Sequence, residues 1–429
     1  MQLYAIVRPA DITQATAQRF QRTASLVIQR FIEMIEGRLC PSFADAVCKI
    51  STALPDTPAS RAWIQNLTLV TEPSVREQFV IEAHLLGHIE ADSPHADRLL
   101  ELLCWEGVGA AATSGRPLDL VMTTSPPGTF AIGLEGAFKV EPGWPVARDW
   151  RLTSHGRVSL AGPHYRETSG EGGHHWVQNI RIKSQGINAY IPLHTPALIN
   201  RDFQEFPMVR SRAFAQSWAE MVSAAAAVII DYSPAAAHWV ETLVQCVVPL
   251  AGGNEVIGSA SREQALGLVF LPGTDRIDQL AECLLHEAMH QLLFRIEACG
   301  ELFLHGTGDE EIYYSPWRTD PRPLRMLLHG AFVFLAVADL YVSEVAERQL
   351  HIDRSECARR AYLRARQART ALETVSECRA LSRFGHVIVD TLLRDLAAIF
   401  EAADPGSAVM ISVEGELLAH RARYAPDAV

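Results

Sequence analysis

The sequence predicts an α+β protein that is mainly α: a helical N-terminal unit, a sheet-rich middle, and a zincin-like HExxH helix with a C-terminal helical stack. Three observations lead to this prediction. Apolar residues recur at three-and-four spacing before residue 110 and again beyond residue 208, as on amphipathic helices. Short apolar runs interrupted by Gly, Pro and Ser fill residues 115–200, a pattern typical of strands and turns. An HExxH segment stands in an apolar helical context after two apolar runs that resemble strands.

The elements follow one another in three expected units, 1–112, 113–205 and 206–429. The first unit contains the helical segments LVIQRFIEMIEGRL (26–39) and FVIEAHLLGHI (79–89). The second contains the strand-like segments LDLVMTT, TFAIGLEGAFKVE and WVQNIRIKSQGINAYIPL. The third begins with a helix over RSRAFAQSWAEMVSAAAAVIIDY, continues with strands in QCVVPLAG and ALGLVFLPG, and then enters a long helix near Asp278. After the turn-like SPWRTDPRP, helices are expected at about 324–350, 354–380 and 384–402.

The composition narrows the class of protein. With 429 residues, 48% of them hydrophobic and 21% charged, the chain is long and apolar enough to fold around a substantial core. Its net charge of -12 repels a polyanion, so we expect no nucleic-acid partner. The N-terminus lacks the pattern of a signal peptide, and the apolar stretches at 224–230 and 331–342 are shorter than the ~20 residues that cross a bilayer. We therefore expect a cytoplasmic protein without membrane contact.

The strongest chemical signal is His286-Glu287-Ala288-Met289-His290, an HExxH motif. Histidines four residues apart lie one turn above each other on a helix, so both imidazoles can bind one cation. Glu287 follows the first of them and is expected near the same site. The sequence therefore predicts a metal centre with His286 and His290 as ligands.

The third ligand must come from elsewhere. A metzincin would need Gly and His at the positions that Leu293 and Ile296 occupy, which excludes that subclass. We favour His329, a lone histidine in the apolar helix PLRMLLHGAFVFLAVADLY, where Gly330 is expected to permit the close approach of another helix. A core histidine is the alternative interpretation of His329. His305 is the reserve candidate, and an acidic ligand of the gluzincin type, Glu297 or Glu301, has poor spacing.

Other histidines carry a weaker signal. His84 and His88 have helical spacing without a central Glu, so we expect two core histidines there. His174 and His175 adjoin a predicted strand, on which neighbouring side chains point to opposite faces, so the two cannot chelate one ion together.

Two arginines, Arg318 and Arg322, lie in the stiff segment PWRTDPRP. A guanidinium group binds a carboxylate through two parallel hydrogen bonds, so this segment is expected to form a carboxylate clamp. The alternative is a structural ion pair of either arginine with Asp320, Glu310 or Glu311.

The succession of GLVFL, LLHEAMHQLLF and YYSPWRTDPRPLRMLLHGAFVFLAVADLY resembles the HExxH-motif family of natural-product clusters, the α-ketoglutarate-dependent HExxH peptide β-hydroxylases. The specific part of the resemblance runs from about Leu268 to Tyr341. It implies Fe(II), with α-ketoglutarate and O2 as co-substrates, and hydroxylation of a side-chain β-carbon in a ribosomally made peptide, with or without a leader segment.

Within that resemblance, His286, His290 and His329 supply three ligands on one face of the iron. Arg318 or Arg322 neutralises the distal carboxylate of the oxo acid, and Glu287 orients a ligand or bound water. Three histidines depart from the usual set of two histidines and one carboxylate, which leaves the ligand set open.

Two other functions remain open at this point. In a zinc peptidase of the gluzincin type, Glu287 would act as general base, and Glu297 or Glu301 would complete the metal site. In a non-catalytic peptide-binding protein, the metal would only hold helices together. The arginine-rich segment 354–369 is expected to form a solvated helix face, and electrostatic steering of an acidic peptide is the weaker interpretation.

Overall fold

The computed structural model confirms a mainly helical α+β protein. It describes residues 9–35, 41–71, 95–112, 118–122, 129–132, 136–139, 150–154, 158–162, 165–168, 176–193, 211–250, 258–309, 311–347, 353–403 and 405–425. The helices of the N-terminal part are α2 (Pro9–Ile35), α3 (Pro41–Ala53), α4 (Pro58–Thr71) and α6 (His95–Ala112). Those of the C-terminal part are α8 (Arg212–Tyr232), α9 (Pro234–Leu243), α10 (Ile277–Cys299), α11 (Leu324–Glu347), α12 (Arg354–Glu377), α13 (Arg383–Ala402) and α14 (Gly406–Tyr424).

The strands fall into four sheets. An antiparallel sheet has the order β1-β4-β5-β6 (Leu118–Met122, Trp150–Ser154, Val158–Gly162, Tyr165–Thr168), and a smaller one has the order β2-β3-β7 (Thr129–Ile132, Gly136–Lys139, Trp176–Gln178). A mixed sheet has the order β11-β12-β10-β9-β8 (Ala260–Ser261, Leu268–Pro272, Cys246–Leu250, Ile187–Ile191, Ile180–Ser184). A two-stranded ribbon pairs β13 (Ile312–Tyr313) with β14 (Arg322–Pro323).

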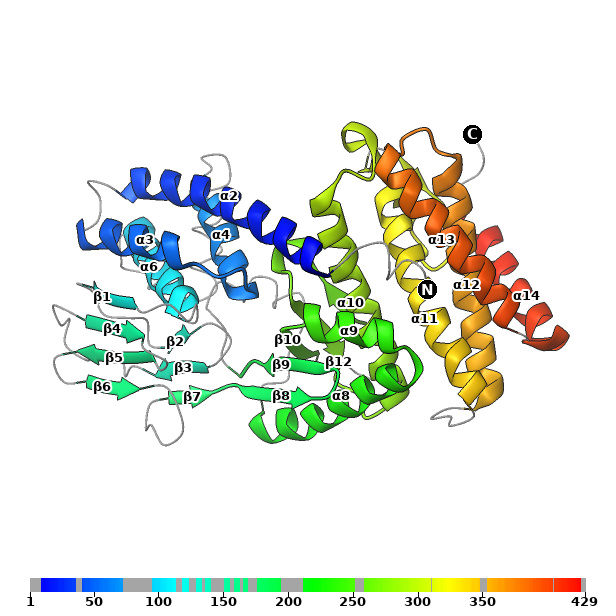
Figure 1. The fold of residues 1–429 in the computed structure, drawn as a ribbon, viewed down its shortest axis with the longest axis horizontal. Coiled ribbons are helices and arrows are strands. Elements are labelled where there is room, and N and C mark those ends of the chain that lie inside the picture. The colour runs from blue at the N-terminus through cyan, green and yellow to red at the C-terminus, as the bar shows by residue number, and fades with distance from the viewer. Residues whose placement is uncertain are drawn as a thin grey trace.

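The N-terminal helices and the first sheets share one hydrophobic core. Figure 1 shows these helices above the sheets at one end of the molecule. Trp63 and Trp105 from the helices and Phe138 from β3 are fully buried in this core. The Trp63 indole donates a hydrogen bond to the Leu103 carbonyl over 2.7 Å, which satisfies its one polar group. The first predicted unit therefore packs together with most of the second.

The mixed sheet belongs to a second core, which positions the HExxH helix. Its strands β8 and β9 come from the end of the predicted middle unit, and β9 pairs with β10 of the following unit, so residue 205 does not separate two cores. β10 and β12 are parallel and buried along their whole length, which is why their sequences are continuous apolar runs. The short β11 pairs antiparallel with β12 at the edge of the sheet, and α10 follows β12 directly.

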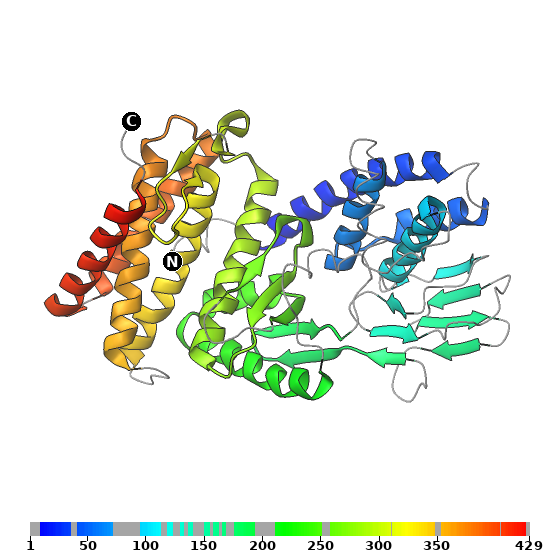
Figure 2. The same ribbon diagram turned by 180° about the vertical axis from the view of Figure 1, so that it is seen from behind.

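The C-terminal helices form the predicted stack. α11 packs between α10 and α12, and α12 in turn contacts α13 and α14 (Figures 1 and 2). The helices predicted at 324–350, 354–380 and 384–402 correspond to α11, α12 and α13, whereas α14 is an additional helix. The predicted helix at 26–39 is the end of the longer α2, and the one at 79–89 lies outside the described residues.

Two helices in the described part of the chain have the length and hydropathy of a membrane span, α8 and the segment Leu324–Ser343 of α11. The prediction that the apolar stretches are too short to cross a bilayer was therefore wrong for these two helices, because each helix extends beyond its most apolar run. In the α11 segment, 78% of the apolar window is buried inside the protein, as expected of a central core helix.

Candidate metal centre and cavity

The structure brings the three histidines predicted as ligands together from two helices. His286 and His290 lie one turn apart on α10, with ring centroids separated by 4.9 Å. His329, on α11, faces His290, and their Nδ1 atoms are 3.2 Å apart. His329 is buried, with His290 and Glu297 as polar neighbours, which is also the environment that the alternative interpretation, a core histidine, describes.

All three histidines line one cavity of about 690 Å³. Its walls come from α10, α11, α12 and the segment between β13 and β14. Aromatic contacts run along one side: Phe334 packs against both His286, at 5.6 Å, and Trp317, at 5.0 Å between ring centroids. The cavity is within the size range of pockets that bind small organic ligands.

Burial keeps the imidazoles of α10 uncharged. It lowers the pKa of His286 to about 4, and the positive charge of Arg364 contributes to the same shift. Burial also lowers the pKa of His290 well below its usual value, with further contributions from the two neighbouring histidines. Both rings are therefore neutral at pH 7, which is the form that binds a metal ion.

A carboxylate and an arginine lie behind His329. Glu297 Oε2 is 3.3 Å from His329 Nε2, and Arg325 donates to both oxygens of Glu297 over 2.8 and 2.7 Å. Burial raises the pKa of Glu297, but the hydrogen bonds from Arg325 and the contact with His329 outweigh it, so the pKa falls to about 2. A carboxylate at Nε2 favours the tautomer with a proton there, which leaves the lone pair of His329 Nδ1 directed at His290.

A gluzincin would use Glu297 or Glu301 as its acidic third metal ligand. Both oxygens of Glu297 are bound by Arg325, so Glu297 supports His329 rather than replacing it. Glu301 is exposed just beyond the end of α10.

The donor set fits a divalent cation in chemistry and in part in geometry. Two nitrogens bound to one metal at about 2.1 Å lie roughly 3.0–3.4 Å apart, and the two Nδ1 atoms are separated by 3.2 Å. His286 contacts the pair of His290 and His329 through the ring of His290. Over the described ranges, no three His, Cys, Asp or Glu side chains already surround a common point as a metal site requires. Binding would therefore need the His286 ring to turn toward the pair.

The Arg325–Glu297 pair yields a stability prediction. Replacing Arg325 with Met should lower the free energy of unfolding at pH 7 by about 2–3 kcal/mol, because it leaves the carboxylate of Glu297 largely buried without its main partner. A carboxylate with a lowered pKa stabilises the folded state above the unfolded pKa, and this contribution is lost as the pH falls toward 2.

Denaturant unfolding from pH 7 to pH 2 checks this prediction. The difference between wild type and Arg325→Met should be full above about pH 5 and should shrink as the pH approaches 2. The double variant Glu297→Met/Arg325→Met is the control, because it removes both charges and should regain part of the stability. A difference that does not change with pH would contradict the assignment.

Glu287 borders the cavity without lining it. A helix turns by about 100° per residue, so the neighbour of His286 points to another side of α10. There the side chain is buried near Ser259 and Ser261 of the edge strand β11 and the residues before it, whose hydroxyl groups lower its pKa. Its Oε1 is 3.9 Å from His286 Nε2, and burial raises its pKa to about 7. Glu287 is not among the described residues that line the cavity.

Arg318 and Arg322 both line the cavity and both bind Asp320, each over 2.9 Å. The alternative of an ion pair with Asp320 is thus present, yet two guanidinium groups share one carboxylate. Glu311 instead accepts a hydrogen bond from Tyr313, and Glu310 lies outside the described residues.

We predicted that Gly330 permits the close approach of another helix. The structure instead places the ring of Trp317 against it. A Cβ atom on Gly330 would lie 2.1 Å from the nearest atom of that ring. The segment that carries Trp317 is also held to α12, because Gln367 donates to the Pro316 carbonyl over 3.2 Å. These contacts fix the two arginines of the segment beside the cavity.

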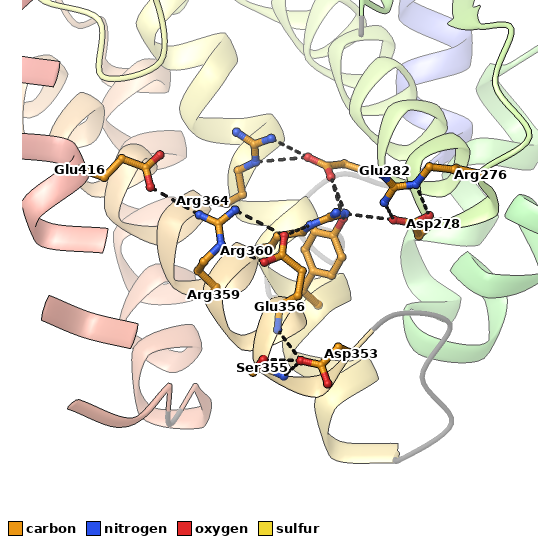
Figure 3. A network of polar contacts seen from close by, with 11 residues as sticks. Arg276, Asp278, Glu282, Asp353, Ser355, Glu356, Arg359, Arg360, Arg364 and Glu416 are labelled. Atoms are coloured by element: carbon orange, nitrogen blue, oxygen red, sulfur yellow. Dashed lines mark hydrogen bonds and ion pairs between the residues drawn. The ribbon is translucent and has the colours of Figure 1, made fainter. Parts of the chain in front are cut away.

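Sequence reasoning missed a second group of arginines. The interpretation of segment 354–369 as a solvated face is wrong for much of it, because three of its arginines line the cavity, together with Arg276 at the N-cap of α10. Figure 3 shows these guanidinium groups directed at carboxylates of α10 and α12. The three residues of α12 are Arg359, Arg360 and Arg364. Their spacing on one helix face was visible in the sequence, but their acidic partners were not.

The remaining histidine candidates are not placed. His84, His88, His174 and His175 lie outside the described residues, as does the side chain of His305.

No protein-family model matches this chain, and no curated protein is significantly similar to it in sequence. The resemblance to the HExxH peptide β-hydroxylases therefore depends on the sequence motifs between Leu268 and Tyr341 alone.

Proposed function

We propose that this protein is a non-haem Fe(II) and α-ketoglutarate-dependent dioxygenase that hydroxylates the β-carbon of a side chain in a ribosomally synthesised peptide. The observation that carries the proposal is the meeting of three imidazoles from α10 and α11 in a cavity whose wall holds paired arginines. The overall reaction converts α-ketoglutarate, O2 and the peptide into succinate, CO2 and the hydroxylated peptide.

In this proposal His286, His290 and His329 hold the iron, which supplies the activation of O2 coupled to decarboxylation of the oxo acid. Glu297 keeps His329 in the tautomer that offers Nδ1 to the cation. Arg318 and Arg322 neutralise the distal carboxylate of the oxo acid, since an unpaired charge in a partly dry cavity is costly. Phe334 and Trp317 form an apolar side that limits the access of water.

The placement of acidic residues favours this proposal over a peptidase. The mixed sheet with its antiparallel edge strand, followed by α10, agrees with a zincin-like arrangement, which both functions would share. A peptidase needs Glu287 beside the metal-bound water and a third, acidic ligand. Here Glu287 points to Ser259 and Ser261, and Glu297 is bound to Arg325. A purely structural metal would also not require an open cavity at its ligands.

One assay tests the function. Protein loaded with Fe(II) under anaerobic conditions should bind α-ketoglutarate, and admission of O2 should release succinate and add one oxygen atom to a substrate peptide. The variant Glu287→Gln should keep succinate release within about tenfold, because Glu287 does not line the cavity, whereas loss of a general base would cost about 10²–10⁴-fold. Zinc-supported peptide cleavage that needs no oxo acid and disappears in Glu287→Gln would establish the peptidase instead.

A further inference from the structure

Two separate groups of arginines border the cavity. The turn group consists of Arg318 and Arg322 with their shared partner Asp320. The α12 group joins α10 to α12 and contains Arg276, Arg359, Arg360 and Arg364 with the carboxylates Asp278, Glu282 and Glu356 (Figure 3). Among the residues that the structure describes, six guanidinium groups and only two carboxylates, Glu282 and Glu356, line the cavity itself.

The turn group has one positive charge more than its carboxylate provides, and the α12 group has one more than its three carboxylates on α10 and α12 provide. In the turn group two arginines share Asp320. In the α12 group four arginines share three carboxylates, and Arg360 alone bridges Asp278 and Glu356 over 3.2 and 2.8 Å. Glu416 touches Arg359 over 3.4 Å from α14, but its side chain is 55% exposed, so water screens that pair. The cavity therefore has charge to accept two carboxylates at two places.

The α12 group adjoins the histidines. The guanidinium carbon of Arg364 lies 4.6 Å from the centroid of the Phe334 ring, and that ring packs against His286 at 5.6 Å. Arg364 is held in this position by Glu282, to which it donates over 2.7 Å. The Phe334 ring thus contacts both Arg364 of this group and His286 of the proposed iron ligands.

The cavity is also larger than an oxo acid requires. At about 690 Å³ it is in the range of pockets that enclose drug-sized ligands, so a small diacid occupies only part of it. The protein as a whole carries a net charge of -12, which makes this concentration of arginines a local feature. A basic cavity in an acidic protein attracts an anionic ligand to that one place.

We propose that the α12 group binds the carboxylate of an Asp or Glu side chain in the peptide substrate, next to the residue that is modified. The inference rests on the proposed function, in which the turn group takes the distal carboxylate of the oxo acid. The substrate class is then an acidic peptide segment.

The test compares two labelled octapeptides, one of alternating Gly and Glu and one of alternating Gly and Gln, by fluorescence anisotropy with the full chain. The Glu peptide should bind at least about tenfold more tightly at low salt, and this preference should narrow as salt is added. Arg359→Gln should weaken binding of the Glu peptide about tenfold or more, the effect of one lost charge-assisted pair. Arg359 is half-exposed, and its partner Glu356 keeps Arg360, so this variant should fold.

Arg369→Gln is the matched control, since Arg369 is on the same helix but binds Glu373 away from the cavity. Its affinity for the Glu peptide should stay within about twofold of wild type. Equal binding of the two peptides, or an equal loss in both variants, would overturn the inference.

The same preparations separate this inference from the function. Binding of Fe(II) and α-ketoglutarate without a preference for the Glu peptide would reject the acidic substrate and keep the hydroxylase. A strong preference for the Glu peptide by protein that binds neither Fe(II) nor α-ketoglutarate would keep the carboxylate site and reject the hydroxylase.

Discussion

Replacing His290 with Ala should abolish stoichiometric Fe(II) binding and, with it, succinate release. His290 is the central member of the group, because it contacts His286 through its ring and His329 through Nδ1. Loss of residues that merely support a metal ligand costs about 10–100-fold in metal affinity, so loss of a ligand should cost more than about 100-fold. Metal content after anaerobic loading and desalting measures the effect directly.

A surface histidine provides the control for this prediction. His238 is exposed on α9 and does not line the cavity, so His238→Ala should keep the metal. Circular dichroism and thermal unfolding verify that the His290 variant is folded. Full retention of Fe(II) by folded His290→Ala would show that the metal centre is elsewhere.

The third ligand is tested in the same way. Fe(II) affinity in His329→Ala should fall as it does in His290→Ala, because their Nδ1 atoms form the close pair. Unchanged affinity in His329→Ala alone would assign a different third ligand.

Local patterns were sufficient to predict the elements that carry the site. The helix spacing of His286 and His290 follows from sequence alone, and so does the burial of the parallel strands β10 and β12, whose apolar runs admit no polar face. His329 could be predicted because a histidine inside the apolar run 326–338 must find a partner when it is buried.

Tertiary contacts account for what the sequence did not reveal. Two carboxylate partners of the α12 arginines, Asp278 and Glu282, are far away along the chain, so only the packing of α10 against α12 shows that those arginines face a cavity. The additional helix α14 was not predicted because its sequence has only a weak apolar pattern. It buries Val413 and is held partly by the ion pair between Arg366 and Glu414. Glu287 was expected at the metal because it adjoins His286, whereas the helical rotation directs it to β11.

Replacing Gly330 with Ala should destabilise the protein and displace Trp317, because the two residues are in close contact. In Gly330→Ala the new Cβ would lie 2.1, 2.6 and 2.8 Å from three atoms of the Trp317 ring. The ring is rigid, and the backbone of α11 is enclosed by the core, so Trp317 must leave its position against Phe334. Overpacking of this kind costs about 1–3 kcal/mol, and the displaced ring also loses its aromatic contact.

Displacement of Trp317 should also disturb the next residue, Arg318, and thereby weaken α-ketoglutarate binding by about tenfold or more. Chemical unfolding and anaerobic titration of the co-substrate measure the two effects. In the double variant Gly330→Ala/Trp317→Ala the clash is absent, so the combined loss of stability should be smaller than the sum of the single losses.

Gly415→Ala is the matched control for the glycine substitution. Gly415 is also inside a helix, on the exposed side of α14, and nothing lies within 4 Å of its added Cβ. This variant should be more stable than wild type by about 0.5–1 kcal/mol, because alanine restricts the unfolded chain and favours the helix. Equal stability of Gly330→Ala and wild type, or purely additive losses in the double variant, would mean that Trp317 does not seal this side of the cavity.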